Sequence, residues 1–202
     1  MKNIFVFCAF HPSAQKNYAK SILNAVPSED VLKCFSAEEH TKLLAARGAP
    51  DGFFAWGFRP GPRLLSTLWR VIEPQDLAVG FFSGQYRVVA KVLAKVESET
   101  LANTIWTNRP VVTDNWLANR SPVPESWRLI VLLSKPQFIQ VSAADLAPHL
   151  PGEYRGAMRM NEGRIKKIVE DFGSLENFVH QRLCSLPPMD SNEQSTKQNS
   201  TL

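Results

Sequence analysis

Residues 77–97 carry the strongest structural signal in the chain, two apolar segments separated by a short turn. The first segment, LAVGFF, is followed by Ser83-Gly84-Gln85, which is typical of a tight turn, and then by YRVVAKVLAKVE. Apolar residues alternate along the second segment and would share one face of a strand: Val88, Ala90, Val92, Ala94 and Val96. The other face would carry Arg87, Lys91 and Lys95. The pattern predicts an antiparallel hairpin whose basic face is either solvated or follows nucleic-acid phosphates.

The other segments mix the two kinds of secondary structure. Short apolar stretches predict further strands at 3–10, 127–134 and 136–142. Apolar residues at helical spacing indicate helices at 14–25, 36–47, 64–72, 98–106, 161–173 and 174–183. Ser36 and Glu39 form a capping-box pattern at the start of the second of these helices. The fold class expected is therefore α+β.

The order of these elements indicates one domain over residues 1–184. Residues 185–202 lack aromatic residues and are dominated by Ser, Asn, Gln, Thr and Pro. Such a composition cannot bury enough apolar surface to become ordered. We expect a disordered tail or a linker there.

Net charge, cysteine spacing and the N-terminal sequence limit the expected cellular compartment and the kind of binding partner. The net charge of +4 is a mild excess that fits an anionic partner but is common without one. The three cysteines, Cys8, Cys34 and Cys184, are too widely spaced to indicate a disulfide framework or a zinc site. The N-terminal apolar run breaks at His11 and Pro12, too early for a signal peptide or a membrane span. We expect a cytoplasmic protein that makes no membrane contact.

Catalytic sequence patterns are absent. The chain has no phosphate-binding glycine loop, no serine nucleophile elbow, no HExxH and no CxxC pair. The four histidines, His11, His40, His149 and His180, lie in different expected elements, without the spacing of metal ligands. Sequence spacing does not exclude a site assembled from distant residues. The chain is nevertheless expected to be no enzyme and to hold no cofactor or metal.

The stretch GFFAWGFRPG, residues 52–61, concentrates aromatic residues around Trp56 and ends in turn-forming residues. An apolar run of this kind is consistent with a buried strand, in which the tryptophan would be part of the core. It is equally consistent with the wall of a pocket that holds a flat ligand. The residues alone leave both interpretations open.

Four segments taken together resemble a known family: FFAWGF at 53–58, EPQDLAVGFFSGQYRVVAKVLAKV at 73–96, TIW at 104–106 and WRLIVLL at 127–133. Their order and spacing are similar to the EVE and YTH-like branch of the PUA superfamily, in the form found in McrB-like N-terminal domains of modification-dependent restriction systems. The closing segment RGAMRMNEGRIKKIVEDFGSLENFV, residues 155–179, extends the resemblance. Two departures are Gln75-Asp76, where the family has Gly-Asp, and Gly156-Ala157, where it has Gly-Phe.

The resemblance implies a small PUA-like β-barrel flanked by helices, with an aromatic cage that receives a flipped, modified base. Trp56 matches the first wall of the cage and Trp106 the second. The resemblance leaves the third wall open among Phe82, Tyr86, Trp116 and Tyr154, with Ser83 as a reader of the base edge. Basic residues flanking these segments are candidates for phosphate contacts: Arg59, Arg63, Lys91, Arg120, Arg155 and Arg159.

Three functions remain open on these grounds. The first is non-catalytic recognition of a modified base in double-stranded DNA, coupled to a nuclease or NTPase partner. The second is a YTH-like reader of methylated adenine in RNA. The third is a barrel that binds a small molecule or a protein, in which the aromatic residues are only core. The first strand and helix, FVFCAFHPSAQKNYAKSI, resemble the restriction-associated form and favour DNA.

Overall fold

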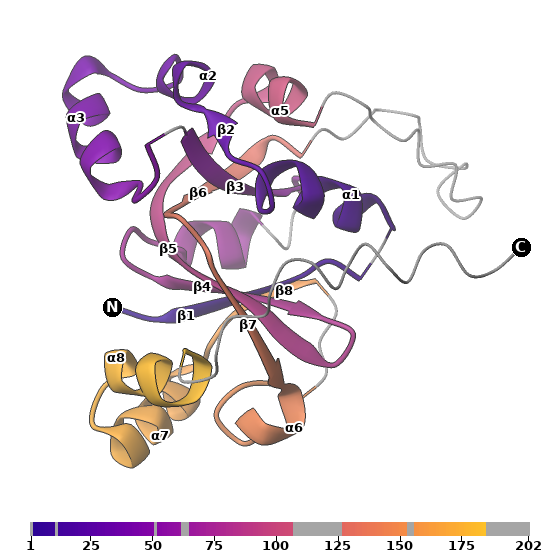
Figure 1. Cartoon of the computed structure of the whole chain (residues 1–202), viewed down its shortest axis with the longest axis vertical. Coiled ribbons are helices and arrows are strands. Elements are labelled where there is room, and N and C mark those ends of the chain that lie inside the picture. The colour runs from indigo at the N-terminus through magenta and orange to yellow at the C-terminus, as the bar shows by residue number, and fades with distance from the viewer. Residues whose placement is uncertain are drawn as a thin grey trace, which may run out of the picture.

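The computed structural model describes residues 2–10, 12–50, 52–61, 65–106, 127–152 and 156–184. A central sheet separates two groups of helices (Figure 1). The helices, including the π-helical turns η1 and η2, are α1 (Pro12–Ser21), α2 (Ser28–Leu32), α3 (Ala37–Ala46), η1 (Leu65–Trp69), α5 (Glu99–Ile105), α6 (Ala143–Leu146), α7 (Glu162–Phe172), α8 (Leu175–Phe178) and η2 (Val179–Leu183). In Figure 1, α2, α3 and α5 lie above the sheet, and α6, α7 and α8 lie below it.

Eight strands form one mixed sheet in the order β2-β3-β6-β5-β4-β1-β8, with β7 paired to β5 outside this path. The strands are β1 (Ile4–Cys8), β2 (Val26–Pro27), β3 (Gly52–Phe58), β4 (Leu77–Phe82), β5 (Gln85–Glu97), β6 (Leu129–Leu133), β7 (Gln137–Ser142) and β8 (Ala157–Arg159). β1 and β4 are parallel, with Ile4 opposite Leu77 and Cys8 opposite Phe81. The other described pairings are antiparallel. The expected α+β class and the β4–β5 hairpin are confirmed.

The long strand β5 bends and pairs with two different strands along one of its edges. Its first half pairs with β7, and its second half pairs with β6 after a register shift between Val92 and Ala94. The expected single apolar face therefore divides at this bulge. Val88 and Val92 pack in the core beside β1 and β3, whereas Ala94 and Val96 pack toward α5.

The described strand pairings do not close into the barrel that the resemblance implies, because β2 and β8 end the path without pairing with each other. Both end strands are short, and β2 contains Pro27, which has no backbone N–H to donate to a further strand. The described sheet is open at these two edges.

Three apolar cores surround the sheet, and alternation along β1 explains two of them. Ile4, Val6 and Cys8 point toward α7 and α8, while Phe5 and Phe7 point toward α1 and β3. Both faces of β1 are buried, which accounts for the uninterrupted apolar run in the sequence. The third core joins β3 and β6 to α2, α3 and α5. At the start of α3 the Ser36–Glu39 capping box forms as predicted.

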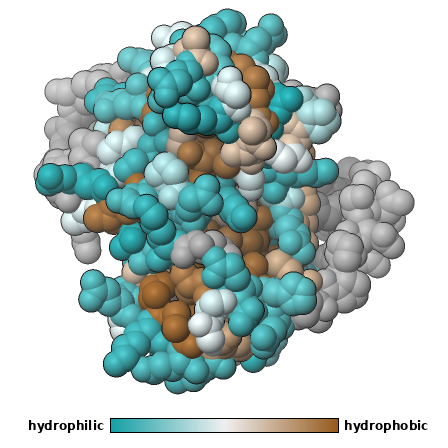
Figure 2. All heavy atoms as spheres, turned by 90° about the vertical axis from the view of Figure 1, so that its left-hand side faces the viewer, coloured by the Kyte–Doolittle hydropathy of each residue, from teal (hydrophilic) through white to brown (hydrophobic). Residues whose placement is uncertain are grey.

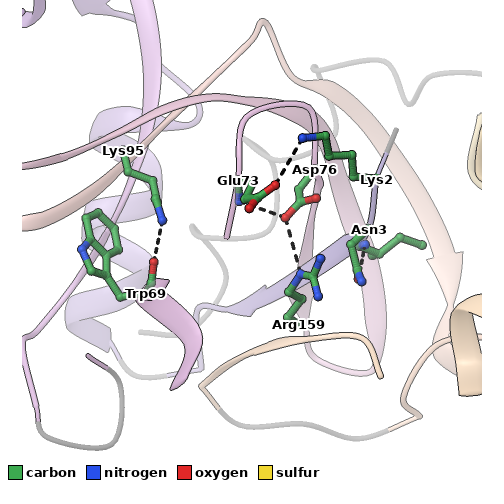
Figure 3. A network of polar contacts seen from close by, with 8 residues as sticks. Lys2, Asn3, Trp69, Glu73, Asp76, Lys95 and Arg159 are labelled. Atoms are coloured by element: carbon green, nitrogen blue, oxygen red, sulfur yellow. Dashed lines mark hydrogen bonds and ion pairs between the residues drawn. The ribbon is translucent and has the colours of Figure 1, made fainter. Parts of the chain in front are cut away.

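Gln75-Asp76, which stands where the resembled family has Gly-Asp, is accommodated by the backbone of the first residue and the side chain of the second. Gln75 adopts φ +76°, a left-handed conformation that glycine can adopt at no steric cost. The fully buried Asp76 carboxylate accepts a hydrogen bond from the Glu73 backbone N–H at 3.0 Å. Arg159 of β8 lies 3.7 Å from the same carboxylate (Figure 3). This turn therefore fixes β8 to the start of β4.

Candidate nucleic-acid interface

Three tryptophans from separate elements converge beside the β3–β6 pair. Trp56 lies in β3, Trp106 follows α5, and Trp127 lies two residues before β6. The ring centroids of Trp127 and Trp56 are 6.0 Å apart, and those of Trp127 and Trp106 are 6.2 Å apart. We call these residues the tryptophan cluster. Both predicted cage walls belong to it, so the structure brings them to one place.

The position of Trp106 is set by a polar contact and by a close approach. Its indole Nε1–H donates to the hydroxyl of Ser21, a fully buried residue of α1, across 3.1 Å. The Ser21 hydroxyl is also 2.8 Å from the carbonyl oxygen of Ala55 in β3. The Trp106 ring covers Gly57, because a Cβ atom there would be 2.6 Å from its Cζ3 and closer still to its Cη2. The glycine after Trp56 in GFFAWGF therefore makes room for the second tryptophan.

Exposure differs within the cluster. Trp56 is 2% exposed and stacks 4.5 Å from Phe7, and Trp106 is 5% exposed. Both rings are mostly core. Trp127 is half-buried, so it is the member with accessible ring surface. Sequence reasoning missed Trp127 as a site residue, although it stands, like Trp106, at one end of the polar sequence 107–126.

Arg59 covers part of Trp127. Its guanidinium carbon is 5.8 Å from the Trp127 ring centroid, within the range of a cation–π contact. The buried Nε of Arg59 has no hydrogen-bond partner within the described part of the chain. Arg59, a predicted phosphate ligand, thus adjoins the accessible face of the tryptophan cluster.

A second aromatic group lies at the tip of the β4–β5 hairpin. Phe82 meets Tyr18 of α1 edge to face, with the centroids 4.4 Å apart. Burial raises the pKa of Tyr18 to about 12, against an opposing effect of nearby Arg87. Ser83 is exposed in the turn, with φ +47°. Phe82 and Ser83 are therefore adjacent at the hairpin tip, and Phe82 packs against the same apolar core as Trp56.

Tyr86 is placed on the opposite face. It is fully buried, packs 5.2 Å from Phe81, and donates its hydroxyl proton to the Pro151 carbonyl at 2.7 Å. Burial raises its pKa. Its core differs from the one that holds Trp56. The structure thus separates Tyr86 from the other described candidates for base binding.

The basic candidates divide by their contacts. Lys91 is exposed on β5, and Arg159 is paired with Asp76. Lys95 turns inward: its ammonium donates to the Trp69 carbonyl at 2.6 Å and lies 5.3 Å from the Trp69 ring centroid (Figure 3). Burial lowers the pKa of Lys95. The predicted basic face of β5 is therefore only partly available to an anion.

Five predicted site residues lie outside the described part of the chain: Trp116, Tyr154, Arg63, Arg120 and Arg155. The 185–202 segment lies outside it as well. Within the described ranges, no three His, Cys, Asp or Glu side chains gather as a metal site. None of the helices found there is long and apolar enough to cross a bilayer.

This α+β architecture is known from a protein solved on modified DNA. It is shared by the N-terminal domain of Thermococcus gammatolerans McrB bound to m5C DNA, with a TM-score of 0.58 and 13% identity over 85% of this chain and 98% of that chain. The structural resemblance expected from the sequence is confirmed at the level of the fold. No protein-family profile and no curated protein matches the chain.

Proposed function

We propose that this protein is a non-catalytic reader of a modified base in double-stranded DNA, which it holds outside the helix against the tryptophan cluster. The observation that carries the proposal is the convergence of Trp56 and Trp106 on the half-buried Trp127. The shared fold with a domain solved on m5C DNA makes 5-methylcytosine the first base to test.

The energetics favour an aromatic site for this task. Extracting a base from a duplex costs a few kcal/mol, and stacking a base on an aromatic side chain returns about 1–3 kcal/mol. Trp127 supplies the stacking face, while Trp56 and Trp106, which belong to different apolar cores, each contact Trp127 and together form a rigid support for it. Their contacts with Phe7 and Ser21 hold the support in place before DNA binds. A preorganised support loses little conformational entropy on binding.

The other predicted contacts belong to the same proposal. Phe82 and Ser83 face the DNA beside the hairpin tip, with Tyr86, Trp116 and Tyr154 kept as further candidates around the base. The basic residues predicted from the sequence are the candidates for phosphate contacts: Arg59, Arg63, Lys91, Arg120, Arg155 and Arg159. The open, bent sheet is the counterpart of the PUA-like barrel, and residues 1–184 form the reading domain. Residues 185–202 form a tail or a linker in this proposal, and a nuclease or NTPase partner supplies catalysis.

Equilibrium binding of the full chain tests the proposal. One duplex is prepared with cytosine, 5-methylcytosine, 5-hydroxymethylcytosine or N6-methyladenine at one position, and a methylated RNA strand is titrated at the same salt concentration. We expect at least a tenfold preference for one modified duplex, equal to about 1.4 kcal/mol. Preference for the RNA would move the function to RNA reading. Equal binding of all duplexes would contradict base recognition.

A further inference from the structure

We propose that Phe10 is a wedge that enters the duplex and fills the space left by the extracted base. The inference rests on the proposed function and adds a residue that acts on the DNA stack instead of on the modified base. Proteins that distort DNA commonly insert an apolar side chain between base pairs. Phe10 has the exposure, the position and the charged surroundings that such a role requires.

Exposure distinguishes Phe10 from the rest of its segment. The five residues of β1 and the following Ala9 are buried, but Phe10 is 61% exposed, the highest value among the described large apolar side chains. A phenylalanine this exposed loses the free energy that its burial would provide. Burial in a base stack on binding would recover that free energy.

The register of the sheet places Phe10 beside the hairpin tip. Cys8 is opposite Phe81 in the parallel β1–β4 pair, and Phe10 follows Cys8 by two residues, as Ser83 of the turn follows Phe81. In Figure 1 the end of β1, the start of α1 and the hairpin tip lie toward the same end of the sheet, at the right of the view. The Phe10 carbonyl accepts a hydrogen bond from the Gln15 side chain at 3.5 Å. Phe10 therefore projects from a position fixed by both neighbouring elements.

The distance from the tryptophan cluster suits a wedge. Phe7 stacks 4.5 Å from Trp56, and Phe10 follows three residues later. Three residues of extended chain span about 10 Å, at roughly 3.3 Å per residue. The same edge of the protein would thus hold the extracted base at the tryptophan cluster and insert the Phe10 ring in the place of that base.

Charge near Phe10 fits a nucleic acid. Lys16 and Lys20 are exposed and four residues apart on α1, so they share its outer side. Arg87 lies near Tyr18, whose ring braces α1 against Phe82 at the hairpin. These three cations lie on α1, which begins two residues after Phe10, and on β5, and they would provide contacts for the phosphates on either side of an opened base pair.

The test compares two DNA ligands that carry the same 5-methylcytosine. In one the base is paired in a duplex, and in the other it lies in a single-stranded bulge, where no pair is opened. We expect Phe10→Ala to weaken binding of the paired ligand about tenfold and to change binding of the bulged ligand less than twofold. Phe10→Trp should restore tight binding of the paired ligand, because a larger ring still fills the gap.

Val169→Ala is the matched control, since Val169 is 42% exposed on α7, at the other end of the molecule. Figure 2 shows that the surface near α7 mixes hydrophobic and hydrophilic side chains. The wedge role would be overturned if Phe10→Ala weakened binding of both DNA ligands equally or weakened binding of neither. The proposed function fails separately, if wild-type protein binds 5-methylcytosine and cytosine equally in both ligands.

Discussion

At the scale of single residues, the close approach of Gly57 and Trp106 makes the sharpest prediction for stability. A Cβ at residue 57 would overlap two carbons of the Trp106 ring, so the ring or β3 must shift. Gly57→Ala should lower the free energy of unfolding by about 1–3 kcal/mol, the usual range for overpacking. Gly61→Ala is the control, because nothing described lies within 4 Å of its added Cβ. Equal urea midpoints for the two variants would contradict the close approach.

Trp127 makes the corresponding prediction for binding. Its ring is half-buried and stands at the accessible side of the tryptophan cluster, so Trp127→Ala should remove most of the tenfold preference for the modified duplex. Trp69→Ala is the matched control, because Trp69 is also half-buried but its described ring contact is with Lys95 and not with a member of the tryptophan cluster. Circular dichroism checks that both variants fold. A Trp127→Ala protein that keeps full discrimination would refute its role.

Trp56 requires a milder substitution. Replacing a buried tryptophan with alanine costs about 3–5 kcal/mol, which confuses loss of binding with loss of the fold. Trp56→Phe retains an aromatic ring against Phe7 and withdraws surface from Trp127. We expect a folded protein whose preference for the modified duplex is reduced several-fold while its binding of unmodified DNA is unchanged. An unchanged preference would restrict Trp56 to a core role.

At the scale of elements, a histidine–carboxylate contact joins α7 to the segment after α6. His149 Nε2 lies 2.6 Å from Asp171 Oδ2, and this hydrogen bond, with one from Lys167, lowers the pKa of Asp171. A carboxylate with a lowered folded pKa stabilises the fold above its unfolded pKa of about 3.9, and that contribution is lost as the pH falls through the folded value.

Asp171→Asn should therefore flatten the loss of stability with acid. Urea unfolding between about pH 6 and pH 2.5 measures this slope, which we expect to be steeper in wild-type protein. Glu170→Gln is the control, because its pair with Lys166 is exposed on the same helix. If the two variants lose stability in parallel with wild type, the His149–Asp171 contact does not stabilise the fold.

The elements also show which features a sequence can reveal. The β4–β5 hairpin and the Ser36–Glu39 capping box were predictable because a few adjacent residues determine them. The division of β5 between β6 and β7 depends on strands some 40 residues away in sequence, and no local pattern encodes that register shift. This division directs Lys95 toward Trp69, so the basic face predicted from alternation is only partly exposed.

At the scale of the whole molecule, the candidate site is assembled from segments that are far apart in sequence. Trp56 and Trp106 could be predicted because short motifs contain them, and the structure places them in contact with one partner, Trp127. Spacing could not separate Tyr86 from them, since the side of a sheet that a residue faces depends on its neighbours. Sequence spacing also could not reveal that Arg159 faces the buried carboxylate of Asp76.

Affinity and base preference should respond to different parts of the molecule. Lysine–phosphate pairs release counterions, so removing one such pair should reduce the slope of log K against log salt by about 0.9. Lys16→Gln and Lys20→Gln together should weaken binding of modified and unmodified duplexes alike and flatten that slope. Trp127→Ala should leave the slope unchanged. Titrations from about 50 to 200 mM salt distinguish the two, and a changed base preference in the lysine variant would contradict this division.

The central claim is that a modified base leaves the DNA and lies against the tryptophan cluster. The most direct measurement is the NMR signal of a duplex whose single 5-methylcytosine carries a ¹³C-labelled methyl group, recorded with and without the full chain. We expect the methyl proton signal to move upfield on binding, through the ring currents of the tryptophans, and Trp127→Ala to abolish the shift. A methyl signal that keeps its duplex position in the saturated complex would contradict the claim.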